Sequence, residues 1–264
     1  MLVRSASWRS TSSKTRTTLP TRLVSESALI RLSFVMRLRE QGTPGRIDLT
    51  ALNHDLEAAT RSWEDDFNEV ADLLPAQERG VEVSEAYQEA FTPVQALQDL
   101  ALANQLNSAT DLRFHFHSAT ADSIRLKVIT RAVLELAATT PHLSSLGVVV
   151  IDEHPYTWEL RGHPVMVYDF GLRPGPGVAS PVTWDDALRG RFTEAFEATW
   201  RQAAEPGQLN RLTLTAALTW RQVSWLRGIS RYLLQAGVPF SQTYVASAMN
   251  ANPTIAAGLV AAYE

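Results

Sequence analysis

The strongest constraint on the fold is the stretch from Gly147 to Leu172, which predicts two buried strands joined by a turn. Four successive β-branched residues, Val148 to Ile151, are typical of a strand that is covered on both faces. Residues 165–170 alternate between two faces, and Gly162 supplies turn chemistry before them. A two-stranded hairpin is only marginally stable alone, so other strands or helices must cover it.

The sequence before the hairpin predicts elements that pack against it. Asp111 to His117 alternates in polarity as a half-buried strand does. Asp122 to Thr139 predicts a helix that ends before Pro141. The order strand, helix, strand, strand forms the first three-quarters of a split βαβ layer, as in ferredoxin-like folds. We therefore predict an α+β fold: a ferredoxin-like antiparallel sheet module, flanked by long helices and followed by an all-helical C-terminal segment.

Helical sequence lies on both sides of this module. A long helix is predicted from Asp48 to Leu74, and a second helical stretch over residues 84–106 is broken at Thr92-Pro93. Residues 209–217 fit either a strand, which would complete the split βαβ layer, or a short helix, which we favour. Capping signals after the glycine- and proline-rich linker 171–177 predict further helices: Thr183 to about Glu205, Thr219 to Gln235, Ser241 to about Asn250, and Pro253 to Tyr263.

The start of the chain is separate from this fold. Residues 1–22 contain five basic residues, no acidic residue and many Ser and Thr. They fit either an organellar transit peptide or a disordered start, which we favour. Residues 27–39 alternate with period two, which predicts a half-buried strand rather than a membrane-bound amphipathic helix.

The predicted domain organisation follows from these patterns. It comprises a disordered start (1–22), an orphan strand from a truncated preceding module (23–42), a helical linker (47–107), the α+β module (108–175) and the helical segment (182–264).

Composition excludes several classes of protein. The 264 residues, of which 45% are hydrophobic, can bury the core of one large or two small domains. The absence of cysteine excludes disulfides, thiolate metal sites and a cysteine nucleophile. A net charge of −4 gives no indication of nucleic-acid binding, and no apolar run is long enough to span a membrane. We expect a cytoplasmic protein, and the preference for Arg over Lys suggests GC-rich, bacterial coding.

Two polar clusters could carry chemistry, but each has a simpler interpretation. The acidic residues 64–66 could form an acid/base pair or a cation site; we favour the solvated face of a helix. His115 and His117 point the same way in a strand and could chelate zinc or copper. Because no third ligand stands at a diagnostic spacing, we interpret them as the outer face of a half-exposed strand.

Two further patterns give no site. Arg221, Arg227 and Arg231 line one predicted helix and could bind a nucleotide, nucleic acid or an acidic partner, but we favour solvated arginines. The glycine-rich stretch 171–177 lacks the third glycine of a dinucleotide fingerprint and contains two prolines. We therefore assign no catalytic, cofactor-binding or metal-binding residue.

Several segments taken together resemble the very large bacterial NAD-specific glutamate dehydrogenases. The resemblance extends from about Val24 to Glu264, and its strongest parts are SWEDDF, starting at Ser62, and the run from TWRQVSWLR to PFSQTYV, residues 219–245. It implies that residues 111–172 form an ACT-like module and that residues 24–40 are the last strand of a preceding module. It also implies that residues 183–264 lead toward a catalytic region without reaching it.

The resemblance implies oxidative deamination of L-glutamate to 2-oxoglutarate with NAD for the full-length family. That chemistry needs a lysine, an aspartate and a glycine-rich NAD loop. Lys14 lies in the predicted disordered start, and Lys127 has no glycine-rich neighbour. We therefore expect an inactive chain, without NAD of its own, that acts as a regulatory fragment.

Its expected partners are the rest of the dehydrogenase polypeptide or further copies of itself, and neither nucleic acid nor membrane. The alternative is a self-standing ACT-like module that binds an amino acid.

Overall fold

A computed structural model describes residues 50, 60–72, 74, 75, 78, 80–117, 120 and 123–263. The expected disordered start and the expected orphan strand lie outside these residues. The elements below all lie within residues 56–264, which form one compact unit.

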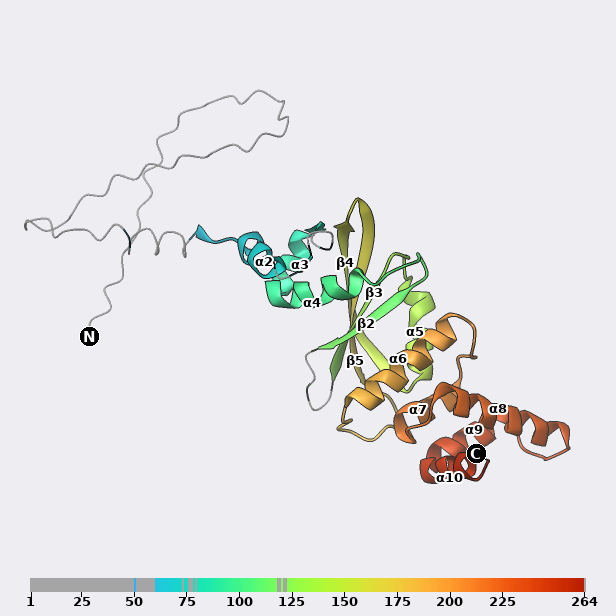
Figure 1. The fold of residues 1–264 in the computed structure, drawn as a ribbon. Coiled ribbons are helices and arrows are strands. Elements are labelled where there is room, and N and C mark those ends of the chain that lie inside the picture. The colour runs from blue at the N-terminus through green and yellow to red at the C-terminus, as the bar shows by residue number, and fades with distance from the viewer. Residues whose placement is uncertain are drawn as a thin grey trace, which may run out of the picture. The chain divides into compact units, whose positions relative to one another are not determined.

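The central element is a five-stranded antiparallel sheet in the order β1-β4-β5-β3-β2 (Figure 1). The predicted hairpin is confirmed and is longer than expected, because β4 and β5 pair from Leu160↔His163 to Val148↔Pro174. Its two-residue turn places Arg161 at φ 54° and Gly162 at φ 74°, as the twist of a tight hairpin favours. The strands are β1 Val81–Val83, β2 Leu112–His117, β3 Ile124–Thr130, β4 Val148–Leu160 and β5 His163–Pro174.

The helix predicted over residues 122–139 is wrong. Residues 124–130 form strand β3, which pairs with β2 on one side and β5 on the other. Every residue from Leu126 to Thr130 is buried, because β3 is central and covered on both faces. Residues 124–128 do alternate between apolar and basic side chains, but Leu126, Ile129 and Val133 also recur at spacings of three and four, which fit a helix equally well. The helix in this region is α5, Leu136–Ser145, and Pro141 lies inside it.

The sheet contains a split βαβ unit, but a different strand begins it. Helix α5 connects β3 to β4, and β5 pairs between these two strands. Strand β2, expected to begin the unit, instead pairs outside β3 as the fourth strand. In a βαββαβ fold that edge belongs to the last strand of the chain; here it is filled by the strand that precedes the unit. Residues 208–215 are helical, as favoured from the sequence.

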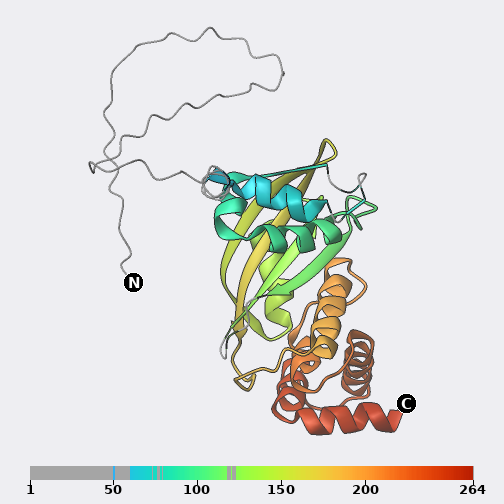
Figure 2. The ribbon, with the colours of Figure 1, turned by 60° about the vertical axis from the view of Figure 1, so that its left-hand side comes forward.

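Helices cover both faces of the sheet. One cluster packs α2, α3 and α4 against β4 and β5 around Tyr87 and Trp158; a second packs α5 and α6 against the other face around Phe170 and Phe196. Figure 2 shows α2 to α4 on one face and α5 on the other. The helices are α2 Trp63–Ala71, α3 Glu85–Ala90, α4 Pro93–Ala103, α5 Leu136–Ser145, α6 Asp186–Trp200, η2 Gln208–Arg211, α7 Leu212–Thr215, α8 Trp220–Gln235, α9 Gln242–Ala251 and α10 Pro253–Tyr263.

Capping decides where the helices begin. The long helix predicted from Asp48 to Leu74 is wrong: residues 61 and 62 are not helical, and Ser62 forms a capping box with Asp65 that begins α2. The predicted break at Thr92-Pro93 is confirmed, since Thr92 caps α4. Asp185, rather than Thr183, caps α6, which ends at Trp200.

The C-terminal helices form a core of their own. Capping by Thr219 and Ser241, as predicted from the sequence, begins α8 and α9. Leu212, Leu226 and Val260 belong to a third cluster of buried residues, separate from the two clusters on the sheet.

Candidate functional site

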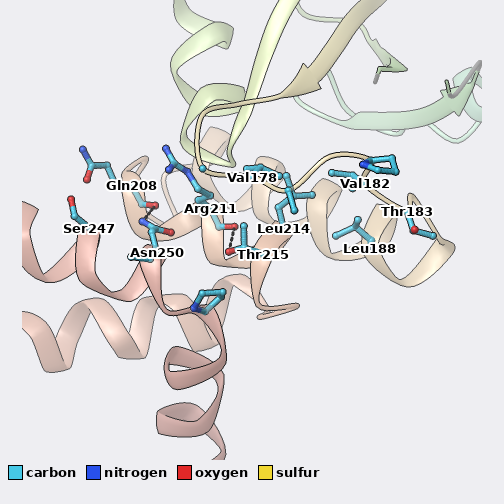
Figure 3. Close-up of a pocket in the computed structure, with 15 residues that line it drawn as sticks. Val178, Val182, Thr183, Leu188, Gln208, Arg211, Leu214, Thr215, Ser247 and Asn250 are labelled. Carbon is cyan, nitrogen blue, oxygen red and sulfur yellow. Dashed lines mark hydrogen bonds between the residues drawn. The ribbon is translucent and has the colours of Figure 1, made fainter. Parts of the chain in front are cut away.

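A cavity of about 730 Å³ lies where the loop after β5 meets the C-terminal helices. In Figure 3 apolar side chains, including Leu188 and Leu214, occupy one side. The polar side chains of Gln208, Ser247 and Asn250 gather on the other side, with Arg211 between the two groups. A mixed lining of this kind suits a small polar molecule.

Two glycines bring the loop close to the helices. At Gly175, a Cβ atom would lie 2.9 Å from the carbonyl oxygen of Gly147. Gly177 has φ 81°, and a Cβ there would lie 3.0 Å from Nη1 of Arg211. Residues 171–174 belong to β5, and Gly177 is followed by a loop rather than a helix, so the linker is shorter than expected. No phosphate-binding turn into a helix forms here.

Arg211 is the one charged residue among the described residues that line the cavity. It ends η2, and its half-buried side chain makes no hydrogen bond or ion pair with any residue in the described part of the chain. Its Nε is buried and has no partner. A guanidinium in this setting favours an anion, above all a planar carboxylate.

Asn250 offers the opposite chemistry. Its Nδ2 donates to the backbone carbonyl oxygen of Gln208 at 2.9 Å. This bond fixes the orientation of the amide, because only the NH₂ group can donate. Oδ1 is buried and has no partner. Two residues that line the cavity thus each hold an unpaired buried atom, a donor on Arg211 and an acceptor on Asn250.

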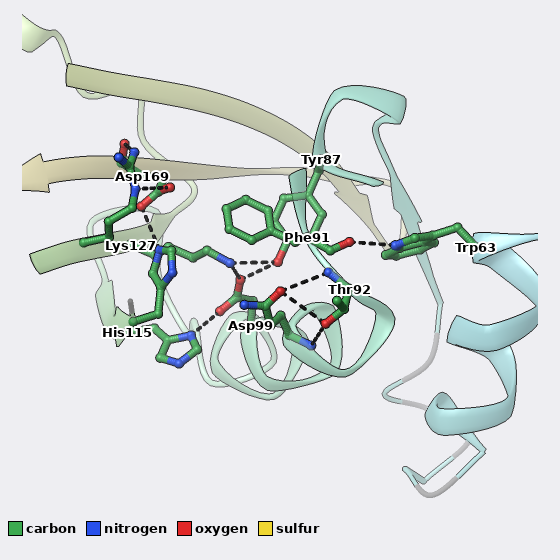
Figure 4. A network of polar contacts seen from close by, with 11 residues as sticks. Trp63, Tyr87, Phe91, Thr92, Asp99, His115, Lys127 and Asp169 are labelled. Atoms are coloured by element: carbon green, nitrogen blue, oxygen red, sulfur yellow. Dashed lines mark hydrogen bonds and ion pairs between the residues drawn. The ribbon is translucent and has the colours of Figure 1, made fainter. Parts of the chain in front are cut away.

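A second polar group lies between α3, α4 and the sheet (Figure 4). Lys127 Nζ lies 2.5 Å from Asp99 Oδ2 and 3.0 Å from the Tyr87 hydroxyl. The Tyr87 hydroxyl donates to Asp99 at 2.5 Å, and His115 Nδ1 lies 2.6 Å from the other carboxylate oxygen. The Lys127 ammonium also lies 3.4 Å from the centroid of the Phe91 ring. This buried network, comprising Tyr87, Asp99, His115 and Lys127, ties α3 and α4 to β2 and β3.

Charge within the buried network is balanced. Burial lowers the pKa of Lys127, and the Asp99 carboxylate offsets part of that change. Burial acts to raise the pKa of Asp99, but hydrogen bonding from His115 and the charge of Lys127 outweigh it and keep that pKa below its ordinary value. Burial, and then the charge of Asp99, raises the pKa of Tyr87. The four side chains satisfy one another, which is the behaviour of a structural network.

The two strand histidines point to the same side, as expected, but are not on an exposed face. Only 22% of the His115 side chain and 11% of the His117 side chain are exposed, because α3 and α4 cover this face. His117 Nε2 lies 2.9 Å from Asp169, which also accepts from Arg125 Nε at 2.9 Å. Among the described residues no group of His, Cys, Asp and Glu could hold a metal ion.

The acidic cluster has structural roles. Asp65 completes the capping box of α2. Arg61 forms ion pairs with Asp66 and Glu69.

The three arginines of α8 do not form one basic face. Arg227 is buried, contrary to expectation, and donates to Asn210 Oδ1 at 2.7 Å. Arg231 pairs with Glu205 at 2.6 Å, and Arg221 stacks on the Trp220 ring.

Arg211 and Asn250 were not singled out from the sequence. Both lie in ordinary helical patterns, and the contact that matters, between Gly177 and Arg211, joins residues far apart in the chain. The one available signal was the glycine-rich loop itself, which indicates that the backbone there approaches another segment closely but does not indicate which segment. In the described part of the chain, no helix is both long and apolar enough to cross a bilayer.

Comparisons with known proteins converge on one family. Successive segments match family models described as glutamate dehydrogenase ACT2 domain (residues 10–64), ACT3 domain (109–185) and helical motif 3 (204–264). The NAD-specific glutamate dehydrogenase of Mycobacterium tuberculosis is 32% identical over 262 residues, covering 91% of this chain and 16% of that protein. The enzymes of Halomonas elongata and Pseudomonas aeruginosa are each 30% identical, covering 91% of this chain and 15% of theirs.

Proposed function

Because this chain belongs to the family of NAD-specific glutamate dehydrogenases, we propose that it is a non-catalytic, regulatory part of such an enzyme. The proposed parent reaction converts L-glutamate, NAD and water to 2-oxoglutarate, ammonium and NADH in the cytoplasm. The observation that carries the proposal is the succession of regulatory-type segments, two ACT matches and a helical motif, across most of the chain. The proposed partners are the rest of the polypeptide or a second copy, without nucleic acid or membrane.

The lysine–aspartate pair in the described residues supports a non-catalytic role. Lys127 is 1% exposed and hydrogen-bonds to Tyr87, and Asp99 is 0% exposed and hydrogen-bonds to His115. A catalytic pair must reach the substrate and stand beside a nucleotide site. The chain spans about 16% of the length of the M. tuberculosis relative. We place the catalytic residues and the NAD site in the remaining polypeptide.

The first test measures activity directly. The purified chain is incubated with L-glutamate and NAD, and NADH formation is followed by absorbance. We expect no turnover. Glutamate-dependent NADH formation that survives further purification would contradict the proposal.

The second test asks whether the chain serves the parent enzyme. The matching region of the M. tuberculosis enzyme is replaced by this chain, and NADH formation and assembly are compared with a deletion of the region. We expect the chimera to retain activity and the deletion to lose assembly or regulation. A matched pair of chimeras carries Asp99→Asn, in the buried network, or Asp186→Asn, which is fully exposed. Activity of the first, but not the second, should become heat-sensitive. A deletion indistinguishable from the intact enzyme would refute a regulatory role.

One observation favours the alternative of a self-standing ligand-binding module. The sequence predicts only three strands of a four-stranded layer, and β2 pairs with β3 as the fourth. The module is therefore complete within the described residues. The activity and chimera tests separate the alternatives, because a self-standing module would not support the activity of the relative.

A further inference from the structure

We propose that the cavity beside Arg211 binds a small organic acid that carries a carboxylate and a separate N–H or O–H donor, such as an amino acid or a hydroxy acid. The cavity lies between the loop after β5 and the C-terminal helices, and none of its lining residues belongs to a strand. The inference rests on this cavity alone and does not need the proposed function.

Arg211 selects for the carboxylate. Its guanidinium is half-buried and, among the described residues, has no carboxylate within ion-pair distance. By contrast, Arg201 and Arg231 pair with acidic residues. A partly desolvated charge without a partner is unfavourable, and a bound carboxylate would supply both the charge and the two parallel hydrogen bonds that a guanidinium prefers.

Asn250 selects against an anion that has no hydrogen-bond donor, such as sulfate. Its Oδ1 is an acceptor, held in place by the bond from Nδ2 to Gln208, and it would repel a second anionic oxygen. An ammonium or hydroxyl group would satisfy it. The exposed side chains of Gln208 and Ser247 stand beside it and can also accept (Figure 3).

The size and lining of the cavity fit such a molecule. A volume of about 730 Å³ lies within the usual range for small-ligand sites. The apolar side, with Val182, Leu188 and Leu214, can cover the carbon chain. Neighbouring atoms shield Arg211 Nε and Asn250 Oδ1 from water. Binding therefore requires a small side-chain movement, which the exposed Gln208 and Ser247 at the rim permit.

The test is isothermal titration of the whole chain with four probes: L-glutamate, 2-hydroxyglutarate, 2-oxoglutarate and sulfate. The three acids have the same carbon chain and differ in the group at carbon 2. We expect saturable binding of L-glutamate and 2-hydroxyglutarate. We expect binding at least ~10-fold weaker for 2-oxoglutarate, which has no donor at that position, and for sulfate, which has no donor at all.

Variants locate the site. Arg211→Gln should weaken glutamate binding at least ~10-fold, whereas Arg211→Lys should retain part of it. Arg221→Gln is the matched control: it removes the same charge from an exposed arginine that stacks on Trp220, and should bind as the wild type does. If Arg211→Gln fails to fold, the probe series and Arg211→Lys still test the inference.

Three outcomes would overturn it: no saturable binding of any acid by the wild type, equal binding by the Arg211 and Arg221 variants, or equal binding of glutamate and 2-oxoglutarate. These outcomes leave the proposed function intact, because the activity and chimera assays measure different properties.

Discussion

Asp99→Asn is the most informative single substitution in the buried network. It keeps the size of the side chain and removes its charge, so that the Lys127 ammonium, 1% exposed, loses the one carboxylate with which it pairs among the described residues, at 2.5 Å. Removing one partner of a buried ion pair typically costs about 3–5 kcal/mol. For a unit of this size that corresponds to a fall in Tm of about 6–20 °C.

Removing the other partner of the ion pair, Lys127, should cost less free energy. In Lys127→Met, the Asp99 carboxylate still accepts from the Tyr87 hydroxyl at 2.5 Å and lies 2.6 Å from His115. We expect a loss of about 1–3 kcal/mol. The double variant should lose less than the sum of the two single variants, because it leaves no unpaired charge.

Urea unfolding followed by tryptophan fluorescence and circular dichroism measures these free energies. Asp186→Asn is the matched control, since its carboxylate is fully exposed and lies 3.8 Å from Arg189; we expect no measurable change. A change below about 1 kcal/mol in Asp99→Asn, or a larger loss in Lys127→Met, would refute the assignment of Asp99 as the centre of the network.

Three further predictions test other parts of the structure. The folded-state pKa values of Asp99 and Asp169 lie below the ordinary value of 3.8. Their contribution to stability is therefore present above pH 3.8 and is lost as the pH falls through the lower, folded-state values. Urea titrations between pH 6 and 2 should show this loss of stability, and a smaller loss in Asp99→Asn. Gly177 has φ 81°, and the Cβ of Gly177→Ala would lie 3.0 Å from Arg211 Nη1, so this change should lower thermal stability by about 1–2 kcal/mol. The same change at the exposed helical Gly190, where the added Cβ would meet no neighbouring atom within 4 Å, should be neutral or stabilising. Thr219→Ala removes the side-chain cap of α8 and should cost about 1 kcal/mol in chemical unfolding, an effect that Thr219→Ser should largely spare.

Local signals in the sequence predicted local structure well. Thr219 and Ser241 begin helices as expected, because a cap is a contact between residues three positions apart. The hairpin around Gly162 was equally clear, since its turn and its strands are adjacent in sequence. Strand β3 was not, because apolar residues at spacings of three and four (Leu126, Ile129 and Val133) fit a helix as well as the alternation of residues 124–128 fits a strand.

The candidate site could not be predicted for a related reason. Gly177 and Arg211 meet through the tertiary fold, and nothing in either local pattern indicates the other. The shared orientation of His115 and His117 was correctly predicted from strand geometry. Their partners Asp99 and Asp169 come from other elements, so the covered environment of the histidines was missed.

The position of β2 has a consequence for the order in which the protein can form. In a βαββαβ sheet, the last edge remains open until the end of the domain has left the ribosome. Here the strand for that edge is made before β3, so the pairing of β2, β3, β4 and β5 requires nothing beyond residue 174. The nascent sheet can close its hydrogen-bond ladder while α8 to α10 are still being synthesised. Those helices, with a core of their own, can then change position without unpairing a strand.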